Sequence, residues 1–156
     1  PGRFGGVFKV SQSSPSAGAG TISIAAVGDA HHAGFDNIAF ASRNHVLVVE
    51  DAGDGMHTQR NELDSGWVYD VSDDSPEAVR WLAEGRDASA TFDALGGPSY
   101  NDGDNEITGI HVSDGDPTPA GLLGAKVPDV TSSSWRTFWT QQHGDNVTWE
   151  VLWSRR

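Results

Sequence analysis

The chain has no cysteine, which excludes both a disulfide framework and a thiolate metal site built from its own residues. Basic residues are also few, because 10 Lys and Arg stand against 22 Asp and Glu, giving a formal charge of −12 at pH 7. This balance argues against binding to nucleic acid or to an anionic membrane surface, and it is typical of cation-binding or highly soluble proteins. No apolar run is long enough to cross a bilayer, so the sequence predicts no membrane span.

An initiating methionine is also lacking. The chain begins Pro1-Gly2-Arg3, and its one methionine is Met56. We therefore expect a processed segment of a longer protein, whose export signal would lie in the missing part. At 156 residues the chain is at most one ordinary domain, long enough to bury a core.

The composition indicates β structure, since the chain has 19 glycines, six tryptophans and few long helix-favouring stretches. Short apolar runs alternate with clusters of Gly, Asp, Asn, Ser and Pro, which predicts a series of short strands. The predicted strands are Gly6–Val10, Thr21–Val27, Phe35–Phe40, Val46–Glu50, Gly66–Val71, Ala78–Ala83, Glu106–Val112, Trp135–Thr140 and Val147–Trp153. A helix from Pro76 to Glu84 is the alternative for the sixth. We expect irregular connections at Ser11–Gly20, Arg86–Asn105 and Asp114–Ser134, and a loop at His31 and His32.

Two segments of the chain, approximately 35–71 and 105–153, share one order of features. Each runs from an Asn-containing start through an apolar strand, a turn and a second apolar strand to a polar stretch with Gly-Asp and a Trp-bearing third strand. Two diverged copies of an antiparallel unit are typical of neighbouring blades of a β-propeller. We therefore predict an all-β fold, with residues 1–156 forming a partial β-propeller domain of roughly two to three blades. A β-sandwich of unrelated strands is the alternative.

The apolar run Val46–Val49 ends abruptly in two adjacent carboxylates, Glu50 and Asp51. In a propeller the end of a blade's innermost strand opens onto a central channel, where side chains from several blades converge. Carboxylates gathered there repel one another unless a cation lies among them. In the second copy Glu106 begins the first strand, and the residues equivalent to the acidic pair are Gln142 and His143.

Residues 35–55, 103–116 and 138–145 together resemble the C-terminal part of the PhoX-type alkaline phosphatases, which are secreted bacterial enzymes with relatives in algae and plants. The shared signatures are Asp-Asn before an apolar strand, Glu-Asp at the end of the next, a Glu-Ile-Thr-Gly stretch, and a strand ending in Gln-His. They occur in the family's order. The resemblance implies a six-bladed propeller, an extracytoplasmic or secreted location, and hydrolysis of phosphate monoesters at a calcium and iron cluster in the channel.

Carried over to this chain, the resemblance makes Glu50 and Glu106 metal ligands, with Asp51 as a third. Candidate residues for binding the substrate phosphate are His57, Arg60, Gln142 and His143. The family also has a cysteine ligand, which this chain lacks, and the stretches Arg86–Asn105 and Asp114–Ser134 look longer than in the family. The alternative function is an inactive propeller that serves as a calcium-binding, ligand-binding or structural module.

An incomplete propeller would leave unpaired strand edges and apolar faces exposed. We therefore expect another polypeptide to complete it, namely the N-terminal part of the same precursor. Because cysteine is absent, the two would be held together noncovalently.

Overall fold

A computed structural model describes residues 3–52, 56, 62–84, 92–93, 97–100, 106–119, 126–142 and 146–154. The elements it describes are all β-strands, which confirms the predicted all-β class. They are β1 (Gly6–Gln12), β2 (Gly20–Val27), β3 (Phe35–Phe40), β4 (His45–Glu50), β5 (Ser65–Asp70), β6 (Val79–Ala83), β7 (Phe92–Asp93), β8 (Gly97–Tyr100), β9 (Glu106–Ser113), β10 (Arg136–Gln142) and β11 (Thr148–Val151).

Each strand predicted from the sequence is present, with ends that differ by a few residues. The helical alternative near Pro76 is wrong, because Val79–Ala83 pairs with β5 as a strand. The prediction of an irregular connection at Arg86–Asn105 is also wrong in part, since this stretch contains the small antiparallel hairpin β7–β8. Its strands are only two and four residues long, so they show no alternation of apolar and polar residues that would predict them.

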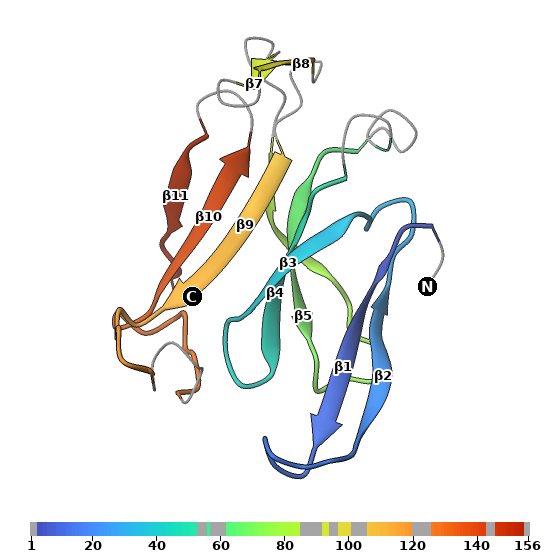
Figure 1. The fold of residues 1–156 in the computed structure, drawn as a ribbon, viewed down its shortest axis with the longest axis vertical. Coiled ribbons are helices and arrows are strands. Elements are labelled where there is room, and N and C mark those ends of the chain that lie inside the picture. The colour runs from blue at the N-terminus through green and yellow to red at the C-terminus, as the bar shows by residue number, and fades with distance from the viewer. Residues whose placement is uncertain are drawn as a thin grey trace.

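All the described strand pairs are antiparallel, and paired strands are consecutive in the sequence. The sheets are the hairpin β1–β2, the four-stranded meander β3–β4–β5–β6, the three-stranded meander β9–β10–β11 and the hairpin β7–β8. Figure 1 shows the four-stranded sheet between the β1–β2 hairpin and the three-stranded sheet. None of these sheets closes on itself.

Strand β4 is the most deeply buried strand of the sheets that the structure describes. Its residues after His45 are all buried, which fits the continuous apolar run in its sequence. Val46 and Val48 form the core cluster with Trp67 and Tyr69 of β5, on the face toward the β1–β2 hairpin. Because side chains alternate along a strand, Leu47 faces the other way, where it shares a cavity wall with Trp153.

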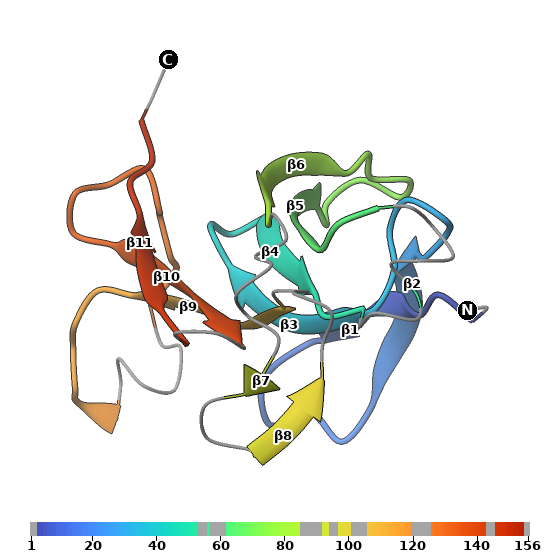
Figure 2. The same cartoon turned by 90° about the horizontal axis from the view of Figure 1, so that it is seen from above.

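The four-stranded sheet is therefore a middle layer. On one face Val7 of β1 and Ala26 of β2 pack against its core cluster. Toward the other face, β9 runs against both β3 and β4. Figure 2 shows the three groups of strands in this order when the molecule is seen from above.

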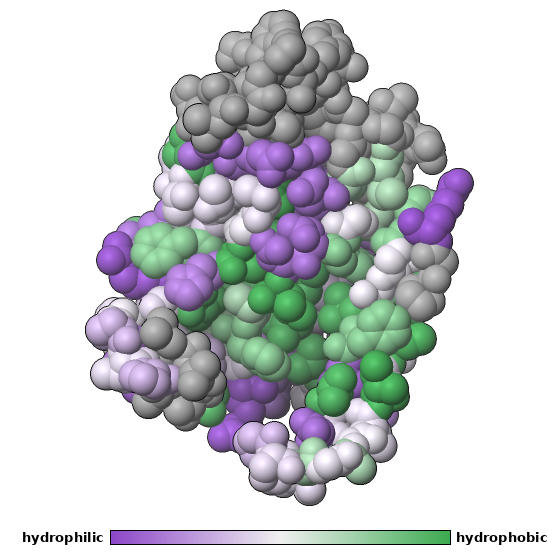
Figure 3. Space-filling model, in the orientation of Figure 1, coloured by the Kyte–Doolittle hydropathy of each residue, from purple (hydrophilic) through white to green (hydrophobic). Residues whose placement is uncertain are grey.

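The β1–β2 hairpin exposes an apolar face. Its register places Phe8 opposite Ile24 and Val10 opposite Ile22, and all four side chains are about half exposed or more. Side chains directly opposite in an antiparallel pair lie on the same face, so the four form one surface, here called the hairpin face. Apolar side chains cover the lower right of the molecule in Figure 3, where this hairpin lies.

Candidate functional site

Glu50 ends β4 as a fully buried carboxylate, with 0% of the residue exposed. Its Oε1 accepts a hydrogen bond from the backbone N–H of Ala33 at 2.6 Å, and its Oε2 accepts one from the backbone N–H of Ser65 at 3.0 Å. A buried carboxylate is costly unless hydrogen bonds replace its water shell, and these two backbone donors do so. Glu50 thereby fixes the loop before β3 and the first residue of β5 to the end of β4.

The backbone around Glu50 is packed closely. Asp51 N–H donates to the carbonyl of Gly34 at 2.9 Å, and Ala52 N–H donates to Oδ1 of the buried Asp64 at 3.0 Å. Gly34 has φ +64°, and a Cβ there would lie 2.7 Å from the Cα of Ala52. Glycine is required at this position both for its backbone conformation and for space.

Glu106, the second predicted metal ligand, is the first residue of β9 and pairs with Gln142 at the end of β10. Strand β9 contacts β4, so Glu50 and Glu106 belong to strands that touch. Within the described ranges no group of three or more Asp, Glu or His side chains is arranged to hold a metal ion. The shared metal site of Glu50 and Glu106 remains a prediction.

Three of the predicted substrate-binding residues, His57, Arg60 and His143, lie outside the described residues. Gln142 is described: it is half-buried and lies next to the start of β9 through its pairing with Glu106. The end of β10 and the beginning of β9 therefore lie together.

A second polar group, missed by the sequence analysis, lies in the loop between β2 and β3. Asp29 Oδ1 accepts hydrogen bonds from the backbone N–H groups of His31 and His32, at 2.8 and 3.0 Å, and lies 2.9 Å from His32 Nδ1. Burial acts to raise the pKa of Asp29, but these hydrogen bonds and the nearby His32 outweigh it, so the pKa lies below its usual value. The signal in the sequence was an Asp three residues before a His, a spacing that suits an Asp side chain capping its own turn.

The His32 ring packs against Trp67 of β5, with ring centroids 4.4 Å apart. The guanidinium of Arg80, on β6, lies over the same indole at 4.7 Å from its centroid. The His32 contact fixes the loop onto the four-stranded sheet, whereas the Arg80 contact lies within that sheet and has the geometry of a cation–π interaction.

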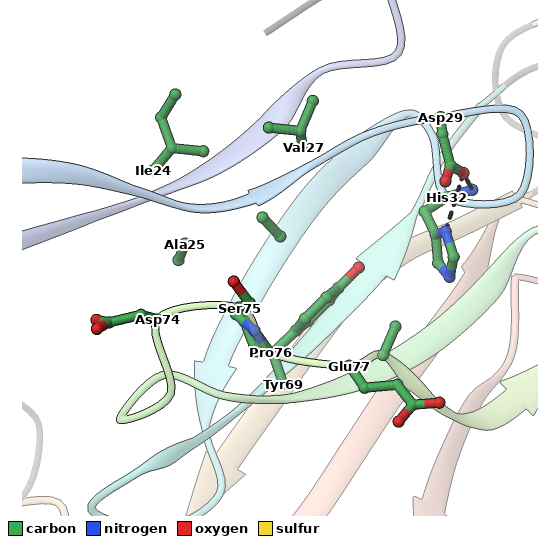
Figure 4. A pocket seen from close by; sticks show the side chains of 12 residues that line it. Ile24, Ala25, Val27, Asp29, His32, Tyr69, Asp74, Ser75, Pro76 and Glu77 are labelled. Atoms are coloured by element: carbon green, nitrogen blue, oxygen red, sulfur yellow. Dashed lines mark hydrogen bonds and ion pairs between the residues drawn. The ribbon is translucent and has the colours of Figure 1, made fainter.

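This loop borders a pocket of about 460 Å³ between β2 and the connection from β5 to β6. Figure 4 shows Tyr69 at its centre, with His32 and Asp29 at one end. Burial, together with the negative charges of Glu50 and Asp29, raises the pKa of Tyr69 and so favours its protonated hydroxyl. The pocket lining consists of Ile24, Ala25, Ala26, Val27, Asp29, His32, Tyr69, Asp74, Ser75, Pro76, Glu77 and Ala78.

The two carboxylates of the acidic turn Asp114-Gly115-Asp116 are paired with the ammonium group of Lys126. Lys126 Nζ lies 2.6 Å from Asp114 Oδ2 and 2.7 Å from Asp116 Oδ2. The hydrogen bonds from Lys126 lower the pKa of both carboxyls, and the two carboxylates raise the pKa of Lys126. This turn is an ion-paired surface loop.

Among the described residues, the structure contains no apolar helix long enough to span a membrane. No protein-family model, curated protein sequence or solved structure matched the chain.

Proposed function

We propose that this chain is part of a metal-dependent phosphomonoesterase that resembles the PhoX-type alkaline phosphatases. The observation that carries the proposal is the burial of Glu50 at the end of the most buried described strand. A carboxylate is among the least common side chains in a protein interior, and its burial costs free energy. Glu50, which the resemblance makes a metal ligand, therefore occupies a buried position where an apolar side chain would cost less free energy.

The arrangement of the sheets supports a propeller. A four-stranded antiparallel meander with other sheets against both faces is the environment expected of a blade between its neighbours. In the proposed protein, calcium and iron are held by Glu50, Glu106 and Asp51 together with residues outside the described ranges. A second polypeptide, from the same precursor, completes the propeller, and the protein acts outside the cytoplasm on small phosphate monoesters.

One observation favours the alternative of a structural or calcium-binding module without turnover. Both oxygens of Glu50 already accept hydrogen bonds from the backbone, from Ala33 and Ser65. These bonds give the buried carboxylate a structural role that needs no metal. In this second proposal Glu50 holds the loop before β3 and the start of β5 at the end of β4, and the chain has a structural role without catalysis.

The two proposals differ in metal content and in turnover. The test uses the protein isolated from its source without chelators, together with any polypeptide that accompanies it. The enzyme proposal expects bound calcium and iron by elemental mass spectrometry, hydrolysis of nitrophenyl phosphate, and loss of that hydrolysis in chelator. Glu106→Gln should lower the metal content and the activity together, because a neutral amide replaces a charged ligand.

The matched control is Asp73→Asn, which removes one negative charge from an exposed position after β5 and should change neither quantity. A folded, metal-loaded protein with no turnover on several phosphate monoesters would overturn the enzyme proposal and leave the module. If Glu50→Gln lowers the unfolding midpoint while the metal content stays constant, the role of Glu50 is structural.

A further inference from the structure

The hydroxyl of Tyr69 points into the pocket of Figure 4, where no described side chain is hydrogen-bonded to it. The residue is only 4% exposed and lines the pocket, and no hydrogen bond joins its hydroxyl to any residue that the structure describes. Its oxygen is not one of the fully buried side-chain atoms that lack a partner, so it is open to solvent in the pocket, where a polar group of a ligand can replace the water that hydrogen-bonds it.

His32 offers a second polar atom to the same pocket. The Asp29 carboxylate is an acceptor, so the His32 nitrogen beside it, Nδ1, is the one that donates. In the neutral imidazole, Nε2 is then an acceptor. Figure 4 shows the ring extending away from Asp29, so that its second nitrogen is turned from the carboxylate.

The charged residues around the pocket favour a ligand of positive charge. Asp29, Asp74 and Glu77 line it, and no lysine or arginine does. A concave site bordered by charges of one sign attracts ligands of the other sign. Anionic ligands such as phosphate esters are therefore disfavoured here, which separates this pocket from the proposed phosphatase site.

The remaining wall is apolar and fits a compact hydrocarbon body. It consists of Ile24, Ala25, Ala26 and Val27 of β2 and, across the pocket, Pro76 and Ala78. A pocket of about 460 Å³ is within the size range of small-molecule sites. The alanines on both walls leave room for a flat ring or a short aliphatic chain between them.

We propose that this pocket binds a small protonated amine with a compact apolar body. An ammonium group has three donors and no acceptor, and the pocket presents three acceptors, the hydroxyl oxygen of Tyr69, Nε2 of His32 and the carboxylate of Asp29. The apolar body lies between the alanines of β2 and Pro76. This inference is independent of the proposed phosphatase function.

Benzylamine is a suitable probe, because it is protonated at pH 7 and carries a flat apolar ring. We expect it to shift the backbone amide resonances of Ala25, Ala26 and Ala78 in two-dimensional NMR spectra of the full chain, with a dissociation constant on the order of millimolar. Benzyl alcohol has the same ring without the charge and should bind about tenfold more weakly. Equal binding of the two compounds would overturn the proposal.

Two variants test whether Tyr69 and Asp29 contribute to amine binding. Tyr69→Phe keeps the ring in the core and should weaken benzylamine binding about fivefold. Asp29→Asn keeps an oxygen for the backbone bonds of the loop and should weaken it about tenfold, since a charge-assisted bond is lost.

The matched control Asp36→Asn removes the same charge from β3 and should leave benzylamine binding unchanged. If Asp36→Asn weakens binding as much as Asp29→Asn, the attraction comes from the acidic chain as a whole and the pocket proposal fails. It fails too if calcium chloride shifts these resonances while benzylamine does not, because the pocket is then a metal-ion site.

Discussion

The indole of Trp153 lies against the indole of Trp81, with ring centroids 5.6 Å apart and planes tilted by 50°. Trp81 belongs to β6, at the edge of the four-stranded sheet, whereas Trp153 follows β11 of the three-stranded sheet. The Trp153 indole N–H also donates to Oγ1 of the buried Thr137 at 2.9 Å. One side chain thus joins two sheets that are far apart in the sequence.

Replacing Trp153 by alanine should destabilise the chain by about 2 kcal/mol, because the change removes a partly buried ring, an aromatic contact and a hydrogen bond. Urea unfolding followed by circular dichroism measures the change in the free energy of unfolding. Trp149→Ala is the control, since Trp149 is 50% exposed and should cost less than about 1 kcal/mol. Equal losses in the two variants would show that the Trp81–Trp153 contact does not stabilise the fold.

Gly66 is a position where even one methyl group should be harmful. A Cβ built there lies 2.5 Å from Cε2 of the Trp81 ring, so the indole rests directly on the glycine backbone. Gly66→Ala should therefore cost about 1–3 kcal/mol through overpacking. At Gly18 a Cβ meets nothing within 4 Å, so Gly18→Ala should be close to neutral in the same urea experiment. A neutral Gly66→Ala would mean that the indole moves away without loss.

The ion pairs of Lys126 predict a dependence on pH. Hydrogen bonds from Lys126 lower the pKa of Asp114 and Asp116 below the usual value of 3.8. A carboxyl with a lowered pKa in the folded state stabilises the fold above its unfolded pKa, and that contribution is lost as the pH falls through the folded pKa. Lys126→Met should raise both carboxyl pKa values toward 3.8, which a carbon-13 NMR titration of the aspartate side chains measures.

Lys9→Met is the control for this titration, because the Lys9 ammonium donates to the carbonyl of Val71 and not to either aspartate. Carboxyl pKa values that stay low in Lys126→Met would show that the turn itself lowers them, because the backbone N–H of Asp116 donates to Asp114 and that of Thr118 donates to Asp116.

The hairpin face leads to a prediction about association. Exposed apolar surface of this kind is uncommon on monomers unless a partner covers it. We expect the protein isolated from its source to elute in size-exclusion chromatography above the 16.6 kDa of the chain alone. The double variant Val10→Lys and Ile22→Lys should shift it toward that mass, because both residues lie opposite each other on the hairpin face. A stable native species of the single chain's mass would contradict the expected partner.

The strands were predictable from the sequence because local patterns determine them. Val46–Val49 is a continuous apolar run, as a strand buried on both faces requires, and the turn residues around it mark its ends. The partners of Glu50 were not predictable, because Ala33 and Ser65 lie 17 and 15 residues away and contribute backbone N–H groups that any residue except proline would supply. The pocket was missed for a similar reason, since Asp29 and Tyr69 meet only after the loop folds onto the sheet.

The position of β4 determines which unfolding events expose its backbone amides to solvent. Its backbone amides are hydrogen-bonded between β3 and β5, while its side chains are covered by the β1–β2 hairpin on one face and by the β9 sheet on the other. No local fluctuation frees these amides without parting both layers, so their exchange with deuterium should report the full free energy of unfolding. Amides of the β1–β2 hairpin, which has one exposed face, should exchange through smaller openings. The cooperative unit of this fold is therefore centred on β4, the strand that carries Glu50.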